Sequence, residues 1–146
     1  MDDGSPEQAG LREARRRVEQ AHRIVVLSGA GMSAESGVPT FRDAQTGLWA
    51  QLRAEDLATE AAFRADPQRV WAWYRHRREQ IAGIEPNAGH RSLADYGRRH
   101  PGRLTVITQN VDGLHQRAGN EDAIALHGNI AQDRWLDRPR ACCDTH

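Results

Sequence analysis

The chain has 146 residues, and its 20 basic side chains, all arginine, balance 20 acidic ones, so the formal net charge is zero. That length suits one domain, and 38% hydrophobic residues are typical of a globular protein rather than a disordered one. A neutral chain supplies no positive electrostatic field to attract nucleic acid. No apolar run approaches the about 20 residues that span a bilayer. The acidic start Met1–Gly4 is unlike a targeting signal. We therefore expect a cytoplasmic protein that binds neither nucleic acid nor membranes.

The first predicted elements are a helix and a strand. Ser5, Pro6 and Gln8 supply an N-cap, a proline at the first helical position and a capping-box residue. Apolar residues then recur at helical spacing, at Leu11, Ala14, Val18 and Ala21. The continuous apolar run Ile24–Leu27 follows and predicts a strand buried on both sides.

The remaining elements continue the alternation of helix and strand. Gly29–Gly31 ends the first strand. We then expect helices at 32–36, 55–65, 66–82 and 86–99, a loop over 40–53, a second buried strand at 104–108, a short helix at 113–117 and a third strand at 122–126. Strands that alternate with helices in this way predict an α/β fold with a parallel sheet and flanking helices.

Each predicted strand ends in polar or glycine-rich sequence. In a parallel sheet the loops beyond the carboxyl ends of the strands face a common crevice, where ligands bind. The first strand runs into Gly29–Ala34, a G-x-G-x-x-A motif that lets backbone amides approach a pyrophosphate, although a tight turn is the alternative. The second runs into Gln109–Asp112 and the third into His127–Asn129.

One feature separates this chain from ordinary dinucleotide-binding dehydrogenases. Roughly 20 residues after the glycine motif, where an acidic ribose ligand is expected, the chain has Leu48–Ala50. Asn110 and Asp112 are candidates to bind ribose hydroxyls or a carboxamide instead, with an Asx turn as the alternative. His127, at a strand end, suits a general base, although a lone histidine is more often structural.

Three motifs together resemble a known family. They are Gly29–Arg42 (GAGMSAESGVPTFR), Thr108–His115 (TQNVDGLH) and Leu126–Asn129 (LHGN), and in this order and spacing they resemble the sirtuins, the NAD-dependent protein lysine deacylases. The resemblance covers about residues 19–137, which we interpret as an incomplete NAD-binding catalytic region with a partial Rossmann-like sheet. Residues 1–18 would be an amino-terminal helical extension, and residues 138–146 a tail outside the resemblance.

The resemblance implies a cofactor, NAD, and a role for each matching residue. The residues that would bind NAD are Gly29, Ala30, Gly31, Ser33, Phe41, Arg42, Trp49, Gln109, Asn110 and Asp112, with Phe41 and Arg42 on a mobile loop that closes over the nicotinamide ribose. His127 and Asn110 would be the catalytic residues. In the sirtuin reaction the amide oxygen of an acyl-lysine attacks the ribose carbon as nicotinamide leaves, and His127 would accept a proton from a ribose hydroxyl.

A further pattern narrows the acyl group. Tyr74 and Arg77 are three residues apart in the predicted helix 66–82 and so share one face, where a phenol and a guanidinium can hold one carboxylate. Similar pairs occur in sirtuins that remove succinyl, malonyl and glutaryl groups, and in these a small residue at the position of Ala58 makes room for the acid. The alternative is that both side chains belong to an ordinary solvated helix face.

The sequence also departs from the sirtuin pattern. Trp135 and Arg138 stand where the first cysteine pair of the family's zinc module is expected, and neither side chain supplies a thiolate. Cys142 and Cys143 do not restore the spacing, so we expect no metal site. The chain ends at His146, before the second cysteine pair and the remaining strands, which indicates truncation. An exposed sheet edge and apolar surface should then favour weak solubility or self-association.

Three functions remain open at this point. The first is NAD-dependent removal of acetyl and, with stronger support, succinyl or malonyl groups from the lysines of proteins, with release of nicotinamide and O-acyl-ADP-ribose. The second is an inactive sirtuin remnant that binds at most NAD or a partner protein. The third is mono-ADP-ribosyl transfer from NAD, which would use the same pocket, and Tyr74 and Arg77 weigh against it.

Overall fold

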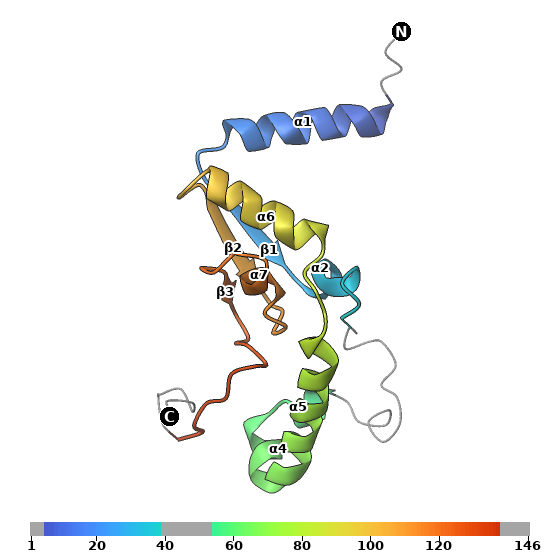
Figure 1. The fold of residues 1–146 in the computed structure, drawn as a ribbon, viewed down its shortest axis with the longest axis vertical. Coiled ribbons are helices and arrows are strands. Elements are labelled where there is room, and N and C mark those ends of the chain that lie inside the picture. Colours follow the sequence, from blue (N-terminus) through green and yellow to red (C-terminus); the bar gives the residue numbers. More distant parts are fainter. Residues whose placement is uncertain (1–4, 39–53, 138–146) are drawn as a thin grey trace.

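The computed structural model describes residues 5–38 and 54–137. Its elements are α1 (Pro6–Gln20), β1 (Ile24–Ser28), α2 (Ala30–Ala34), α3 (Ala54–Leu57), α4 (Glu60–Ala65), α5 (Pro67–Ala82), α6 (Ala88–Arg99), β2 (Leu104–Thr108), α7 (Leu114–Arg117) and β3 (Ile124–Ala125) (Figure 1). The loop expected over 40–53 lies outside the described residues. Within the two described ranges, no helix is long and apolar enough to cross a membrane.

The three strands form a parallel sheet in the order β1-β2-β3. In its register Ser28 is opposite Thr108, which is opposite Ala125, so the three strands end side by side. Helices α6 and α7 lie over one face of the sheet (Figure 1), where Val106 and Thr108 are buried. The predicted α/β fold with a parallel sheet and flanking helices is therefore confirmed.

The opposite face of the sheet corrects one prediction. The run Ile24–Leu27 was expected to be buried on both sides, but Val25 and Leu27 are each 64% exposed and Ile124 on β3 is 50% exposed. Side chains alternate between the two faces of a strand, and α6 and α7 cover only the face to which Ser28 and Thr108 belong. Among the described residues, the sheet is thus covered on one side.

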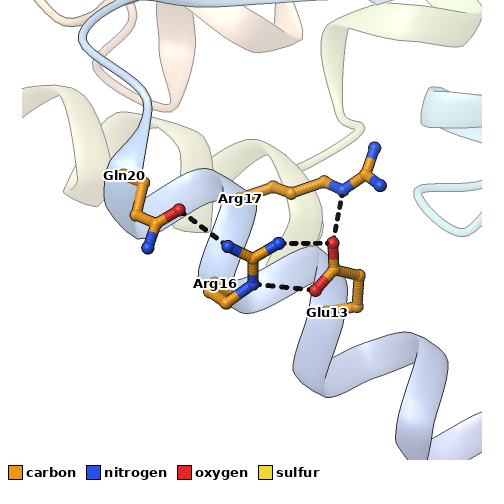
Figure 2. A network of polar contacts seen from close by, with 4 residues as sticks. All are labelled: Glu13, Arg16, Arg17 and Gln20. Atoms are coloured by element: carbon orange, nitrogen blue, oxygen red, sulfur yellow. Dashed lines mark hydrogen bonds and ion pairs between the residues drawn. The ribbon is translucent and has the colours of Figure 1, made fainter.

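Helix α1 follows its predicted start and extends away from the sheet (Figure 1). The Ser5 side chain accepts a hydrogen bond from the Gln8 amide, and none of the residues of α1 is buried. Arg16 and Arg17 bind Glu13, and Arg16 also binds Gln20, on its solvated surface (Figure 2). Exposed pairs of this kind stabilise a helix by only a few tenths of a kcal/mol, about 0.2–0.5 per pair.

Helices α3, α4 and α5 pack against one another as a separate helical lobe. Its core is Leu57, Val70 and Trp73, with Ala62, Phe63 and Tyr74 packed around it. The single helix expected over 55–65 is divided, because Thr59 is extended and its hydroxyl caps α4 by accepting from the Ala62 amide. Helix α5 begins and ends as predicted, with Asp66 as its N-cap.

Smaller differences occur at the edges of other elements. Helix α2 begins two residues before the predicted start, with Gly29 as its N-cap. Helix α6 begins after Asn87, whose side chain caps it and also donates to the Met32 carbonyl, which ties α6 to α2. The third strand was expected over 122–126, but only Ile124–Ala125 pairs with β2.

Candidate active site

A cavity of about 830 Å³ opens at the carboxyl ends of the strands. Nine of the predicted site residues line it: Ala30, Ser33, Ala58, Tyr74, Arg77, Gln109, Asn110, Asp112 and His127. Gly29 and Gly31 lie in the turn beside it, and Phe41, Arg42 and Trp49 fall outside the described residues. The structure therefore brings together residues from all three strand ends and from the helical lobe.

Hydrogen bonds join the first two strand ends. The Asn110 amide nitrogen donates to the Gly29 carbonyl at 2.9 Å and to the Ser33 hydroxyl at 3.0 Å. The Ser33 hydroxyl in turn donates to the Asp112 carboxylate at 2.7 Å, and this bond is buried. An amide group has two hydrogens to donate, so the Asn110 oxygen is the atom that remains to accept from a ligand.

Asp112 also orders the turn that follows β2. Its second oxygen accepts from the Leu114 amide at 2.9 Å, at the start of α7. Gly113 between them has φ +72°, and a Cβ there would meet the Asn129 amide nitrogen at 3.2 Å. An Asx turn, the structural alternative for this aspartate, is therefore present, although Asp112 also belongs to the cavity lining.

The glycine motif leaves space where a nucleotide would lie. A Cβ built on Gly29 or Gly31 meets no atom within 4 Å, and Ala30 and Ser33 of the same turn line the cavity. Open backbone at a strand end fits a ligand that carries phosphate groups, so the residues of this turn are compatible with NAD.

His127 stands at the end of the third strand. Its Nδ1 lies 3.0 Å from the Gln109 carbonyl oxygen. A carbonyl can only accept, so Nδ1 carries the hydrogen and Nε2 keeps its lone pair. The ring is exposed toward the cavity that it lines, and this tautomer is the one that a general base needs.

Tyr74 and Arg77 line the wall of the cavity formed by α5. The Arg77 guanidinium lies 5.1 Å from the centre of the Trp73 ring, and Trp73 packs edge-on against Tyr74. Burial lowers the pKa of Arg77, and Tyr74 opposes this effect; the side chain keeps its charge because arginine titrates far above neutral pH. Exposed Ala58 lies on the same lobe. Helix α5 therefore does not present Tyr74 and Arg77 on an ordinary solvated face.

A buried histidine pair beneath the site was not predicted. His90 of α6 and His115 of α7 are 0% and 1% exposed, and their rings meet edge-on with centres 4.8 Å apart. The Ser28 hydroxyl contacts His115 Nε2 at 2.9 Å, whereas His90 Nε2 and His115 Nδ1 have no hydrogen-bond partner. The one local signal was Asn-x-x-His at the start of α6, since Asn87 caps the helix and His90 Nδ1 faces the Asn87 amide.

The positions expected for the family's zinc module lie only partly within the described residues. The described residues contain no group of three or more His, Cys, Asp or Glu side chains placed to hold a metal ion. Trp135 is half exposed on the segment after β3, and an indole cannot replace the thiolate that zinc takes in such modules. Arg138, Cys142 and Cys143 lie outside the described residues, and no step below depends on zinc.

A parallel α/β sheet with polar loops at the carboxyl ends of its strands gives the chain a Rossmann-like architecture. Residues 29–140 match the model of the Sir2 family. The chain belongs to this family, and the resemblance to sirtuins is confirmed.

Relatives of known name agree with this assignment. The chain is 53% identical over 130 residues to an NAD-dependent protein deacylase of Ralstonia nicotianae. This match covers 89% of this chain and 52% of the relative. It is 52% identical over 128 residues to a protein of the same name from Deinococcus radiodurans, over 85% of this chain and 52% of that one. The chain thus spans about half the length of the curated relatives it matches.

Solved structures give the same result. A Sir2 homologue in complex with NAD superposes with a TM-score of 0.79 at 41% identity, over 89% of this chain and 50% of that one. Sir2 bound to an inhibitor, 2'-O-acetyl-ADP-ribose and a deacetylated p53 peptide superposes with a TM-score of 0.69 at 27% identity, over 89% of this chain and 50% of that one.

The buried histidine pair predicts how stability depends on pH. Burial lowers the pKa of His90, with Asp112 opposing; burial also lowers the pKa of His115, reinforced by His90 and opposed by Asp112. Because both are held neutral in the folded chain, the unfolded chain takes up protons first as the pH falls below about 6.5. We predict a lower free energy of unfolding at pH 5.5 than at pH 7.5, measured by urea denaturation.

Replacement of the pair provides the control. The double variant H90Q/H115Q should show a flatter dependence of unfolding free energy on pH, whereas H22Q, at an exposed position, should keep the wild-type slope. Equal slopes in all three proteins would show that the pair does not carry the pH dependence.

Proposed function

We propose that residues 19–137 form the NAD-binding catalytic region of a protein lysine deacylase, which transfers the acyl group from lysine to ADP-ribose and releases nicotinamide and O-acyl-ADP-ribose. The observation that carries this proposal is that one cavity has in its walls His127, the linked side chains of Asn110, Ser33 and Asp112, and the pair Tyr74 and Arg77. Relatives at about half identity are named NAD-dependent protein deacylases.

The strand ends are proposed to hold NAD. Gly29, Ala30, Gly31 and Ser33 would lie against its phosphates, and Gln109, Asn110 and Asp112 against its nicotinamide and ribose, with Phe41, Arg42 and Trp49 completing the site. NAD supplies the ADP-ribosyl group that accepts the acyl-lysine oxygen. The Asn110 oxygen suits a hydrogen bond from a ribose hydroxyl, because both amide hydrogens are already donated within the chain.

His127 is proposed to accept the proton of a ribose hydroxyl. The Gln109 carbonyl fixes the ring orientation through Nδ1, which leaves Nε2 as the basic atom. A positioned base of this kind contributes typically about 10²–10⁴-fold to a rate. The exposed edge of the ring lets the proton pass on to solvent after transfer.

Tyr74 and Arg77 are proposed to select acidic acyl groups such as succinyl and malonyl. A guanidinium that is partly withdrawn from water binds a carboxylate more strongly than an exposed one, and Arg77 is half-buried in the cavity wall. A carboxylate seated there would also accept from the Tyr74 phenol. Ala58 also lines the cavity, and its small side chain would leave room for the longer acid.

Nicotinamide release from NAD in the presence of a succinyl-lysine peptide tests the proposal. We predict turnover that H127A reduces by about 10²-fold or more. Y74F and R77M should reduce turnover of the succinyl peptide by about tenfold or more, since each removes a bond to the carboxylate, and should change turnover of an acetyl-lysine peptide by less than about threefold.

Each other result has a definite meaning. Equal losses on both peptides would contradict the carboxylate clamp. Wild-type turnover no higher than H127A would contradict deacylation by this chain and favour an inactive NAD- or partner-binding remnant. Radiolabel from NAD transferred to protein, without loss of the acyl group, would establish ADP-ribosyl transfer instead.

Self-association through the exposed sheet is also proposed. Leu27, Ile107 and Ile124 are neighbours across the three strands on the open face, and such apolar surface favours burial against another molecule. We predict oligomers by sedimentation velocity at micromolar concentration, and fewer of them in V25T/L27T. The control L11T changes an equally exposed residue of α1 and should not change the distribution; a monomeric wild type would contradict the proposal.

A further inference from the structure

Arg78 is the residue next to Arg77 on α5, and its side chain is held differently. Its Nε donates to the Ile130 carbonyl at 2.6 Å. Its two terminal nitrogens bind the two oxygens of Asp133, one of them at 3.3 Å. The side chains of Arg78 and Asp133 are 30% and 22% exposed, and the guanidinium also lies 5.5 Å from the centre of the Trp71 ring.

These contacts join two walls of the cavity. Arg78 belongs to the helical lobe, whereas Ile130 and Asp133 belong to the segment that follows β3 and His127. Ile130 is 6% exposed, and its amide donates to the Val111 carbonyl at 2.8 Å, in the turn after β2. Arg78 is therefore connected, through Ile130, to the loop that contains Asn110 and Asp112.

The clasp, meaning the contacts of Arg78 with Ile130 and Asp133, is stronger than an exposed ion pair. Bonds between a guanidinium and a carboxylate are charge-assisted and directional, and partial burial reduces their screening by salt. A second ion pair between the lobe and this segment joins Arg64 to Asp137. Both of these side chains are more than half exposed, so this pair adds little to stability.

The clasp also determines what Arg78 cannot do. Nε and both terminal nitrogens already have acceptors within the chain, and the charge of the Asp133 carboxylate offsets the positive charge that would attract a ligand carboxylate. Arg77, one residue earlier on the same helix, faces the cavity beside Tyr74. The two adjacent arginines thus have different tasks.

We propose that Arg78 is a positioning residue, which fixes the Tyr74–Arg77 face of α5 at a set distance from His127 and so determines how well the cavity accepts a long acidic acyl group. This inference rests on the proposed function. A short acyl group ends near His127 and depends little on α5, whereas a succinyl group must meet both walls at once. Loss of the clasp should therefore weaken the binding of succinyl-lysine more than that of acetyl-lysine.

Two measurements on the same variants test this. The variants are R78Q, R78K, D133N and R78Q/D133N, and the matched control is R75Q, because Arg75 is on the same helix in an exposed pair with Glu79. The first measurement is amide hydrogen exchange of Ile130 and Gln132. The second is the affinity of fluorescent succinyl-lysine and acetyl-lysine peptides in the presence of NAD, with circular dichroism to confirm the fold.

We expect R78Q to raise the amide exchange rate of Ile130 by about tenfold and to lower the affinity for the succinyl peptide by about tenfold. The affinity for the acetyl peptide should change by less than about threefold. R78K should recover part of the loss, since an ammonium meets one of the two partners but not both. The double variant R78Q/D133N should lose no more affinity for the succinyl peptide than R78Q does, because both changes break the same interaction. R75Q should resemble the wild type.

The contrary outcomes are distinct. Unchanged exchange in R78Q would overturn the clasp. Raised exchange with equal weakening of both peptides would overturn the positioning role, since Arg78 would then only stabilise the fold. A wild type that binds both peptides equally would contradict the acyl preference of the proposed function, while raised exchange in R78Q would still support the link between α5 and Ile130.

Discussion

The site depends on the hydrogen bonds of the Asn110 side chain. They hold the turn after β1, through the Gly29 carbonyl, against the turn after β2, and they orient Ser33 toward Asp112. The Asp112 carboxylate accepts a hydrogen bond from the Leu114 amide at the start of α7. Helix α7 contains His115, which contacts the Ser28 hydroxyl. One amide side chain thereby orders two strand ends, a helix start and a buried histidine pair.

The rest of the cavity is built by elements that the sheet does not hold directly. The helical lobe has its own small core around Trp73, and it meets the segment after His127 through Arg78. His127, at the end of β3, and the Tyr74–Arg77 face of α5 thus line the same cavity from two separate elements. In the proposed function, this division would let one cavity combine a reaction centre at the sheet with an acyl preference set by one helix.

Local patterns predicted the elements, and together with the family resemblance they predicted nine of the residues that line the cavity. The cap Ser5 and the apolar periodicity placed α1, and the helical composition of 66–82 placed α5. Parallel strands necessarily bring Gln109, Asn110 and His127 to one edge. The two-sided burial predicted for β1 was wrong, because an apolar run shows that a strand can be buried but not which elements cover it. The pairing of His90 with His115 and of Arg78 with Asp133 was missed, since 25 and 55 residues separate the partners and no periodicity links them.

Calorimetric titration of the chain with NAD tests the central claim, that the linked strand ends form a nucleotide site. The account predicts saturable binding, weakened by about tenfold or more in N110A and S33A, each of which breaks the link between the turns. S5A, which removes the cap of the distant helix α1 at a cost of about 1 kcal/mol, should bind like the wild type. Absence of saturable binding by the wild type, or equal affinity in all four proteins, would contradict the account.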